Sequence, residues 1–593
     1  MSWLISSLLA DYRARSFTPV AVMEQVLANI ARAPDRRAWI SLVPSERVLA
    51  YATALATRDP ATLPLYGVPF AIKDNIDLEG VPTTAGCPDF AYTPTRSAFV
   101  VEKLIAAGAI PIGKTNLDQF ATGLVGTRSP YGAGRNSFDP DYISGGSSSG
   151  SAIAVAMGLV SFSLGTDTAG SGRVPAAFNN IVGLKATCGA LSTSGVVPAC
   201  RSLDCVSVFT LTADDSRRVF SVAAAFDPED PYSRLAGDRW ANSSPAFRFG
   251  VPRAAQLEFF GDAEYTRLFA EAVSRLESLG GRRVEIDFEP FLATARLLYE
   301  GPWVAERYCA VGDFLEQKPD SMHPVTRQII ASGRKASAAD AFRAQYRLME
   351  LRRATEQAWA DMDVLLTPTA GTIYRIEAVE ADPVRLNSNL GYYTNFVNLL
   401  DLAAVAVPAG FRSDGLPFGV TLVGRAQSDA DLLALAGRLH HATPVMLGAL
   451  DVGVPSAEPT QAAGERVHVA VCGAHMEGLP LNHQLASRDA VLITRTRTAP
   501  SYRFFALPGG PTLRPGLVKV ADGGGAIEVE VWSVPVDRFG SFVAGIPAPL
   551  GIGRVELENG EQVSGFICES YAAAGATDIT EFGGWRQYLA SMV

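Results

Sequence analysis

The chain has 593 residues, of which 48% are hydrophobic and 19% are charged, a balance typical of globular proteins and far from that of disordered chains. Its length exceeds what one hydrophobic core supports, so we expect at least two domains. The net charge of −10 argues against a nucleic-acid partner, and an anionic substrate would need a local cation in so acidic a protein.

The lack of a recognisable targeting segment and the pattern of cysteines both predict a cytoplasmic protein. No window approaches the length of a membrane span, and the N-terminal apolar run lacks the basic start and cleavage site of a signal peptide. The seven cysteines form no C-x-x-C pair, and the two closest, Cys200 and Cys205, have no histidine nearby. We therefore expect reduced thiols, a cytoplasmic location, no membrane contact, no metal and no cofactor.

The first 210 residues predict strands that alternate with helices. Thr18 and Pro19 indicate the start of a helix. The alternation favours a mostly parallel sheet covered on both faces, with the active site at the C-terminal ends of strands, where Lys73 and Asp167 lie. The predicted elements that follow the first helix are a buried strand within 64–76, a helix over 97–109, a strand over 110–115, a small-residue helix over 149–158 and a strand over 159–167.

The rest of the chain predicts a second, more helical region and then a separate domain. Residues 451–465 are small, contain proline and lack periodicity, which is typical of a linker. The predicted domains are therefore residues 1–450 and, after the linker, an α+β domain of residues 466–593. The elements are helices over 262–281 and 339–362, strands over 364–370 and 403–410, a closing helix over 429–443, and then strand-like runs over 466–473, 490–498, 526–534 and 554–568, the last with a hairpin turn at Asn559-Gly560.

Ser171 lies between two glycines in "GTDTAGSGR", a stretch suited to expose a hydroxyl and several N–H groups. All six histidines lie at position 323 or later, so a Ser-His-Asp triad would need one of them to fold back. The nearby run "SGGSSSGSA" matches by letter the G-x-S-x-G motif, the nucleophile elbow of α/β-hydrolases. The alternative is a flexible loop or one that binds phosphate. The run is no Walker A loop, because no Gly-Lys-Ser/Thr follows it.

Lys73 is the other candidate base. A free lysine has a pKa near 10.4, and burial can lower that value by roughly 3. Lys73 directly follows an apolar strand, where a lysine is readily buried. The alternative is a lysine that forms an ion pair with Asp74 or Asp77.

Four stretches in this order resemble the amidase signature family over most of residues 20–445: "GVPFAIKDNID", "GKTNLDQFATG", "GGSSSGSA" and "GTDTAGSGRVPAAFNNIVGLKAT". The resemblance implies a mixed central sheet covered by helices and a Ser–Ser–Lys catalytic set. Ser171 corresponds to the nucleophile, Ser147 to the bridging serine, whose peptide bond is cis in the family, and Lys73 to the base. The oxyanion hole would consist of the N–H groups of Thr168, Ala169, Gly170 and Ser171.

The chain departs from the family pattern at two places. It has "GGSSSG" where the family commonly has "GGSSGG", and "GLKA" where the family has "GLKP". Neither change alters a chemical group, so we expect the activity to survive both.

Two further stretches, "LLYEGPWVAERY" and "VCGAHMEGLPLNHQL", resemble the allophanate hydrolases. That resemblance implies an anionic small-molecule substrate, allophanate, a urea that carries a carboxylate. Arg307 would bind the carboxylate, with Tyr299 as a second substrate contact and Gly123 lining the pocket. The alternatives are a surface salt bridge of Arg307 with Glu300 or Glu306, and a core position for Tyr299.

The last domain resembles the γ-glutamyl cyclotransferase-like fold attached to these enzymes. It would help the first product, N-carboxycarbamate, to lose carbon dioxide, with His475 as the candidate residue and a structural histidine as the alternative. The resemblance also implies a homodimer and a role in urea or s-triazine degradation.

Three rival interpretations stay open. A general amidase of the same family would share Lys73, Ser147 and Ser171 without needing Arg307. A glutamine amidotransferase subunit would work in a complex and carry no such tail. A non-enzymatic protein would use the C-terminal domain for dimerisation, but the presence of all three catalytic residues argues against it.

Overall fold

The computed structural model describes residues 3–234, 246–455, 466–486, 488, 490–508 and 513–592. These residues divide into a large unit, up to residue 455, and a small unit, from residue 466. Each unit buries hydrophobic cores of its own. Of the predicted linker, Val454 packs against the large unit's core, whereas residues 456–465 lie outside the described residues.

An 11-stranded sheet forms the centre of the large unit, in the order β1 (Trp39–Leu42), β3 (Ile110–Thr115), β2 (Pro69–Lys73), β4 (Phe162–Asp167), β6 (Cys205–Thr210), β5 (Val182–Lys185), β10 (Leu402–Phe411), β11 (Pro417–Arg425), β9 (Val364–Pro368), β7 (Phe247–Pro252) and β8 (Gly281–Ile286). β2 runs parallel to β3 and β4, and β7 runs parallel to β8 and β9. The other neighbours are antiparallel.

The sheet is therefore mixed, as the family resemblance implies, and the mostly parallel sheet that the alternation favoured is wrong. The reason lies in the connections. Parallel neighbours need a long crossover, whereas residues 412–416 alone join β10 to β11, so those two strands can only pair antiparallel.

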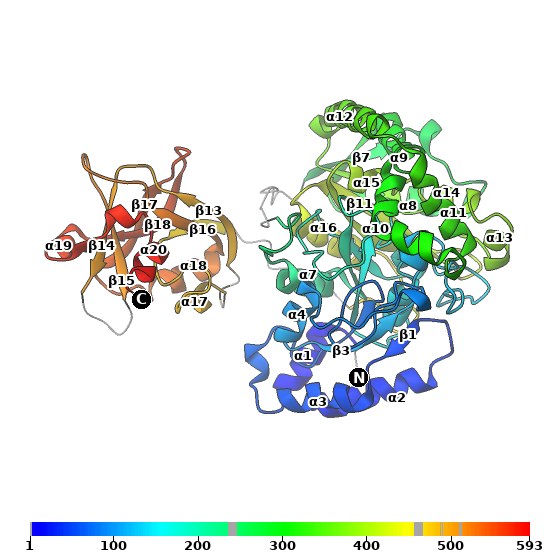
Figure 1. Ribbon diagram of the computed structural model, residues 1–593, viewed down its shortest axis with the longest axis horizontal. Helices are drawn as coiled ribbons and strands as arrows, with labels where there is room; N and C mark the ends of the chain where they lie inside the picture. The colour runs from blue at the N-terminus through cyan, green and yellow to red at the C-terminus, as the bar shows by residue number, and fades with distance from the viewer. Residues whose placement is uncertain are drawn as a thin grey trace. The chain divides into compact units, whose positions relative to one another are not determined.

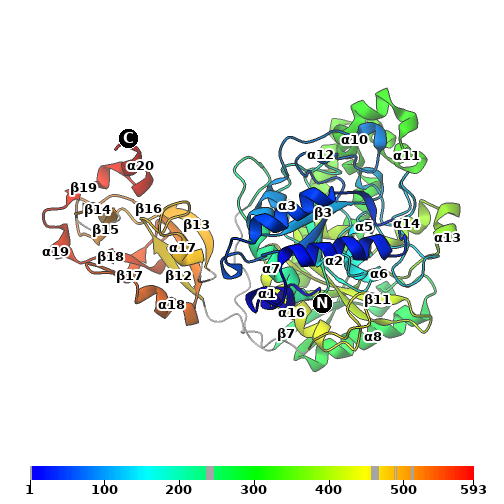
Figure 2. The ribbon, with the colours of Figure 1, turned by 90° about the horizontal axis from the view of Figure 1, so that it is seen from below.

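Helices surround this sheet (Figures 1 and 2). The Thr18 side chain accepts a hydrogen bond from the Ala21 N–H and caps α2, as the Thr-Pro pair predicts. The helices are α1 (Ile5–Arg13), α2 (Pro19–Arg32), α3 (Ser45–Leu55), α4 (Phe99–Ala106), α5 (Ser149–Ala156), α6 (Val174–Phe178), α7 (Ala213–Ala223), α8 (Ala263–Ser278), α9 (Glu289–Glu300), α10 (Trp303–Gln317), α11 (Pro324–Ser332), α12 (Ala338–Asp361), α13 (Ile376–Ala381), α14 (Arg385–Leu390), α15 (Phe396–Leu399) and α16 (Asp429–His441).

The predicted elements around the motifs are confirmed. β2, β3 and β4 lie where the sequence places them, and β2 ends at Lys73. The small-residue helix α5 is buried along its whole length and packs on β2, β3 and β4. A Cβ atom at Gly150 would lie 2.1 Å from the Ala38 carbonyl oxygen, so the helix can approach its neighbours this closely only with glycine there.

Residues 108–115 match the P-loop pattern G-x-x-x-x-G-K-T by letter but do not form that loop. Residues 110–115 form strand β3, and the buried amine of Lys114 lies 3.1 Å from the Asp74 carboxylate. A lysine held in an ion pair inside a strand cannot reach a bound phosphate, so this match carries no function.

The small unit is β-rich. A five-stranded sheet has the order β13 (Val491–Arg497), β16 (Glu528–Pro535), β12 (Arg466–Val471), β18 (Gln562–Cys568) and β17 (Leu550–Glu556). A second, three-stranded sheet has the order β15 (Arg514–Lys519), β14 (Tyr502–Leu507) and β19 (Thr577–Asp578). The predicted hairpin at Asn559-Gly560 is confirmed, because it joins β17 to β18. The described residues of this unit also form the short helices α17 (His483–Ala486), α18 (Val536–Val543), α19 (Ser570–Ala573) and α20 (Trp585–Ala590).

Candidate active site

Lys73 ends β2 with a side chain that no solvent reaches. Its amine lies 2.8 Å from the Ser147 hydroxyl and 2.7 Å from the Thr166 hydroxyl of β4. The two strands are parallel neighbours, so their C-terminal ends, Lys73 and Thr166, meet at one edge of the sheet. Sequence reasoning did not find Thr166.

The alternative partners of Lys73 are engaged elsewhere. The Asp74 carboxylate pairs with Lys114, and Asp77 accepts a hydrogen bond from the Thr83 hydroxyl. Within the described ranges no carboxylate lies at ion-pair distance from Lys73. The predicted alternative, an ion pair with Asp74 or Asp77, is therefore wrong.

Burial sets the charge of Lys73. It lowers the pKa of the amine to about 7, although the carboxylates of Asp118, Asp204 and Asp167 partly oppose the shift. Near neutral pH, the side chain therefore exists substantially as a free amine, which can accept a proton.

Ser147 follows a cis peptide bond with Gly146, at the entrance to α5. Its main-chain carbonyl accepts a hydrogen bond from the Asp118 N–H, at 3.1 Å. The next residue, Ser148, anchors the same turn to β4, because its hydroxyl donates to the Thr166 carbonyl at 3.1 Å. Ser147 is thus held in place by its own main-chain carbonyl and by the side chain of its neighbour Ser148.

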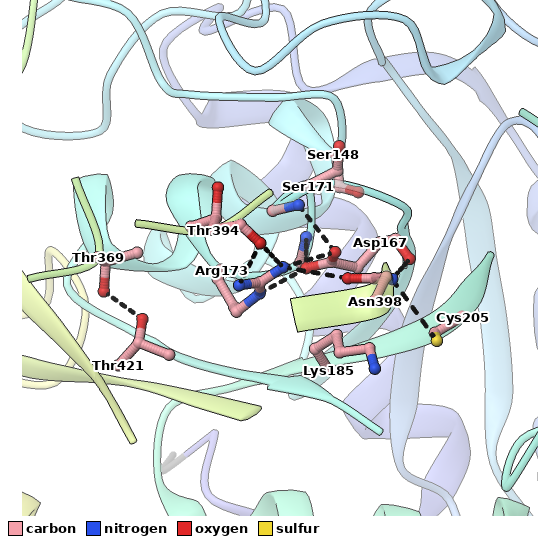
Figure 3. Close-up of polar contacts among 12 residues, drawn as sticks. Ser148, Asp167, Ser171, Arg173, Lys185, Cys205, Thr369, Thr394, Asn398 and Thr421 are labelled. Carbon is pink, nitrogen blue, oxygen red and sulfur yellow. Dashed lines mark hydrogen bonds and ion pairs between the residues drawn. The ribbon is translucent and has the colours of Figure 1, made fainter. Parts of the chain in front are cut away.

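The loop that carries Ser171 is built around the Asp167 carboxylate (Figure 3). That carboxylate accepts the N–H groups of Gly170 at 2.8 Å and Gly172 at 3.0 Å, and it forms a buried ion pair with Arg173. The Ser171 hydroxyl is 3% exposed and donates to the Gly123 carbonyl at 3.5 Å. No hydrogen bond joins Ser147 to Ser171 in the described part of the chain.

Of the four N–H groups predicted to form an oxyanion hole, one has an acceptor and three have none among the described residues. The N–H groups of Thr168, Ala169 and Ser171 donate to no acceptor among the described residues, whereas the N–H of Gly170 is used by Asp167. The Thr168 hydroxyl in turn donates to the buried carboxylate of Asp204. Three main-chain donors are therefore available beside Ser171.

Asp118 shapes the segment that faces Ser171. Its carboxylate accepts the N–H groups of Val125 at 3.2 Å, Gly126 at 2.9 Å and Arg128 at 2.9 Å. A Cβ atom at Gly123 would lie 2.6 Å from an Asp118 carboxylate oxygen, so glycine is required where this segment passes Asp118.

Arg307 lies on α10 and is 3% exposed, so it is not a surface residue. Its guanidinium donates to the Thr122 hydroxyl at 3.1 Å and to the Ala121 carbonyl at 3.4 Å. The proposed salt-bridge partner Glu306 instead accepts hydrogen bonds from the Ser202 N–H and hydroxyl, both at 2.7 Å. The surface salt bridge considered from the sequence is therefore wrong for Glu306.

Another buried guanidinium, that of Arg128, lies near Arg307 and was not found by sequence reasoning. It donates to the carbonyls of Thr122 at 2.9 Å and Pro383 at 2.6 Å, and its Nε has no partner among the described residues. Tyr299, a partly buried residue of α9, lies near both Arg128 and Arg307. Two cations therefore converge on the residue that precedes Gly123.

His475 lies in the small unit. Its Nε2 is 3.0 Å from the Gln484 side-chain oxygen, and its ring stacks on Phe566 and meets Phe542 edge-on. Burial lowers the pKa of the imidazole below its usual value. The surroundings of His475 are those of a packed aromatic residue.

In the described ranges, no group of three or more His, Cys, Asp and Glu side chains is placed to hold a metal ion. No helix in those ranges is long and apolar enough to cross a membrane.

Comparisons with known proteins agree with this architecture. A family model described as "Amidase" matches residues 21–433, and one described as "Allophanate hydrolase C-terminal domain" matches residues 467–590. Urea amidolyase of Saccharomyces cerevisiae is 46% identical over 99% of this chain, and this chain spans 33% of that protein's length. One subunit of the glutamyl-tRNA(Gln) amidotransferase of Chloroflexus aurantiacus is 34% identical, over 72% of this chain and 94% of its own length.

Among solved structures, the allophanate hydrolase of Kluyveromyces lactis matches with a TM-score of 0.74 and 46% identity, and the match covers 100% of both chains. A full-length match of this kind agrees with the family model, which covers more than half of the chain. The chain belongs to the amidase family.

Proposed function

We propose that the chain hydrolyses the terminal amide of allophanate, giving ammonia and N-carboxycarbamate, which then loses carbon dioxide. The observation that carries the proposal is the buried contact between the Lys73 amine and the Ser147 hydroxyl, beside the loop that presents Ser171. The full-length similarity to an allophanate hydrolase supports the choice of substrate.

In the proposed first step, the neutral amine of Lys73 accepts the Ser147 proton while Ser147 accepts that of Ser171. The lowered pKa of Lys73 supports this, because an amine that stayed charged would have no lone pair to offer. The Ser171 oxygen then attacks the amide carbon. For this step the Ser171 hydroxyl would have to leave the Gly123 carbonyl and donate to Ser147.

The attack turns the amide oxygen into an oxyanion. The N–H groups of Thr168, Ala169 and Ser171 have no acceptor among the described residues and are available to stabilise that charge. The Gly170 N–H is a weaker candidate, because it would first have to leave Asp167.

Breakdown of the tetrahedral intermediate reverses the relay. The proton held by Lys73 returns through Ser147 to the leaving nitrogen, and ammonia departs from an acyl-enzyme on Ser171. Water, activated by the same pair, then attacks the acyl carbon and releases N-carboxycarbamate.

The substrate carboxylate has a proposed site at the two buried cations. Arg307 would bind it with the planar fork of its guanidinium, Tyr299 would supply a hydroxyl, and Arg128 would add a second positive charge close by. Gly123 would leave room beside the nucleophile.

The small unit's proposed task is to speed the loss of carbon dioxide from N-carboxycarbamate. Its match to the allophanate hydrolase C-terminal domain supports a role in this reaction. His475 packs between the rings of Phe542 and Phe566, which favours a structural role over that of a proton donor. We also propose a γ-glutamyl cyclotransferase-like fold for the small unit, a homodimer, a cytoplasmic location and a role in urea or s-triazine degradation.

The experiment compares ammonia release from allophanate, urea, biuret and malonamide under one set of conditions. We expect kcat/KM to be highest for allophanate, because only allophanate presents a carboxylate to Arg307. A higher value for neutral malonamide would favour a general amidase of the family instead.

A further inference from the structure

Two thiols outside the proposed active site lie in contact. The Sγ atoms of Cys188 and Cys205 are 3.4 Å apart. The contact follows from strand pairing, because Lys185 of β5 faces Ser207 of β6, Cys188 lies just after β5, and Cys205 begins β6. The fold therefore brings the two cysteines to the same end of one antiparallel pair.

The two thiols differ in their surroundings. Cys188 is half-buried, its Sγ lies 3.7 Å from the Lys185 amine, and the Arg234 guanidinium donates to its carbonyl at 3.2 Å. Cys205 is 2% exposed. The contact with Cys205 and the charge of Lys185 lower the pKa of Cys188 below its usual value, whereas burial raises the pKa of Cys205.

Cys188 lines a cavity of about 230 Å³ whose wall includes Arg201, Tyr232, Arg234 and Asp401. Arg201 and Tyr232 are exposed, so the rim of this cavity meets solvent. A volume of this size holds several water-sized molecules, which is enough for a hydroperoxide.

Cys205 is tied to the loop that presents Ser171. Its Sγ lies 3.8 Å from the Asn398 side-chain nitrogen, which also donates to the Asp167 carbonyl at 2.8 Å. The Asn398 side-chain oxygen accepts from Arg173 at 3.3 Å, and Arg173 holds the Asp167 carboxylate (Figure 3). A movement of Cys205 would therefore displace Asn398 and alter its hydrogen bonds with Asp167 and Arg173.

We propose that Cys188 and Cys205 form a reversible disulfide when a hydroperoxide enters this cavity. The Cys188 thiolate attacks one peroxide oxygen, an S–O bond forms, the O–O bond breaks, and the leaving oxygen takes a proton. The Cys205 thiol then attacks the Cys188 sulfur, the S–S bond forms, and the hydroxyl leaves as water. The two thiols lose two electrons, the peroxide gains them, and an added dithiol reverses the change by exchange.

Closing the bond shortens the Sγ–Sγ separation from 3.4 Å to about 2.05 Å. Because Asn398 touches both Cys205 and the main chain of Asp167, the shift would disturb the support of the Ser171 loop. We therefore expect the oxidised chain to hydrolyse its substrate more slowly.

The test treats the full chain with hydrogen peroxide, alkylates the free thiols and maps the peptides by mass spectrometry. We expect the loss of two of the seven thiols and one peptide that links Cys188 to Cys205. In Cys205→Ser, a sulfenic acid should persist on Cys188 and be trapped by dimedone, whereas Cys188→Ser should leave Cys205 reduced.

Cys309→Ser serves as the matched control, because Cys309 is exposed and lies outside this cavity. It should form the linked peptide as the unaltered chain does. Two results would overturn the proposal. One is the absence of the linked peptide from the unaltered chain while its Cys309 is oxidised. The other is that Cys205 is oxidised in Cys188→Ser to the same extent as in the unaltered chain.

Hydrolysis of the proposed substrate provides the second readout. We expect a loss of about tenfold or more on oxidation, recovery with dithiothreitol, and resistance to peroxide in Cys188→Ser. A linked peptide with unchanged activity would overturn the coupling to the Ser171 loop. Because the thiol map needs no substrate, failure of the proposed function would leave the first result intact and is distinguishable from failure of this inference.

Discussion

The Lys73 amine and the Ser147 hydroxyl lie 2.8 Å apart, and neither side chain is exposed to solvent. Lys73 reaches this point because β2 ends there, and Ser147 because the chain turns into the buried helix α5. Within the described ranges no carboxylate lies at ion-pair distance from Lys73, so nothing in direct contact fixes the amine in its charged form.

Lys73→Ala, Ser147→Ala and Ser171→Ala should each lower kcat by at least about 10³-fold, because the proposed relay needs all three groups. The double variant Lys73→Ala/Ser147→Ala should be scarcely slower than either single variant, because each single change already interrupts the proton transfer. Steady-state kinetics checks both points. Ser163→Ala removes another buried hydroxyl, one that donates to the Ala71 carbonyl, and should keep near-normal activity. Normal turnover in Lys73→Ala at pH 7 would rule the relay out.

The pH profile of kcat/KM should rise with pH around a midpoint near 7. The pKa of Lys73 is lowered to about 7 by burial, and only the neutral amine accepts the Ser147 proton. Rates measured from pH 5.5 to 9 check this, with far-ultraviolet circular dichroism as the control for folding at each pH. A profile that is flat between pH 6 and 8 contradicts the assignment of Lys73 as the base.

Lys73 should also lower the free energy of unfolding of the chain near neutral pH. The pKa of Lys73 in the folded chain, about 7, lies below its ordinary value of 10.5. Between these two pH values the unfolded chain therefore binds more protons than the folded chain. The contribution of Lys73 to the free energy of unfolding consequently rises with pH across that window. Lys73→Met should therefore raise the free energy of unfolding at pH 7 by about 1 to 3 kcal/mol, and the gain should shrink towards pH 10. Denaturant titration at both pH values measures it. A variant that is less stable at pH 7 and equally so at pH 10 would contradict a buried, readily neutralised amine.

The sequence placed Lys73 and Asp167 correctly at the ends of β2 and β4, because the strand pattern of each stretch stops there. The motifs could not reveal Thr166, whose hydroxyl meets Lys73 only after two parallel strands pair. Arg128 was missed for a related reason. Its role depends on contacts with Thr122 and with Pro383, a residue 255 positions away in the chain, and no local pattern encodes such a contact.

Asp204→Asn should lower kcat by about tenfold with little change in KM. The buried Asp204 carboxylate accepts the Thr168 hydroxyl and the N–H groups of Ala199 and Cys200, so it positions a proposed oxyanion donor without touching the substrate. Thr168→Val removes the same hydrogen bond from the other side. The losses in the double variant should be far from additive. Additive losses, or a loss confined to KM, would show that Asp204 does not act through Thr168.

Arg307→Lys should cost allophanate hydrolysis about ten- to a hundredfold in kcat/KM, because a lysine offers a point charge in place of a planar fork. Hydrolysis of neutral malonamide should lose less. Arg296→Lys on α9 is the matched control, since Arg296 is exposed and pairs only with Glu289 among the described residues. Equal losses for both substrates would mean that Arg307 supports the Ala121–Thr122 segment and does not select for a carboxylate.

Residues 1–455, expressed alone, should still release ammonia from allophanate. The proposed relay and substrate contacts all lie in the large unit, which has its own cores, whereas the core that surrounds His475 contains only residues of the small unit. The truncated chain should release carbon dioxide more slowly than ammonia, because N-carboxycarbamate would leave without the small unit's help.

Ammonia and carbon dioxide followed separately from the full chain, the truncation and His475→Ala decide what the small unit does. Burial lowers the pKa of His475, so at pH 7 its ring is mostly neutral and a poor proton donor. We therefore expect His475→Ala to keep the product ratio of the full chain while lowering the unfolding temperature, because the ring fills space between Phe542 and Phe566.

If His475→Ala instead delays the release of carbon dioxide as much as the truncation does, with no change in unfolding temperature, the imidazole is the donor. If the truncation itself releases both products in the full chain's ratio and at its rate, the small unit takes no part in the chemistry.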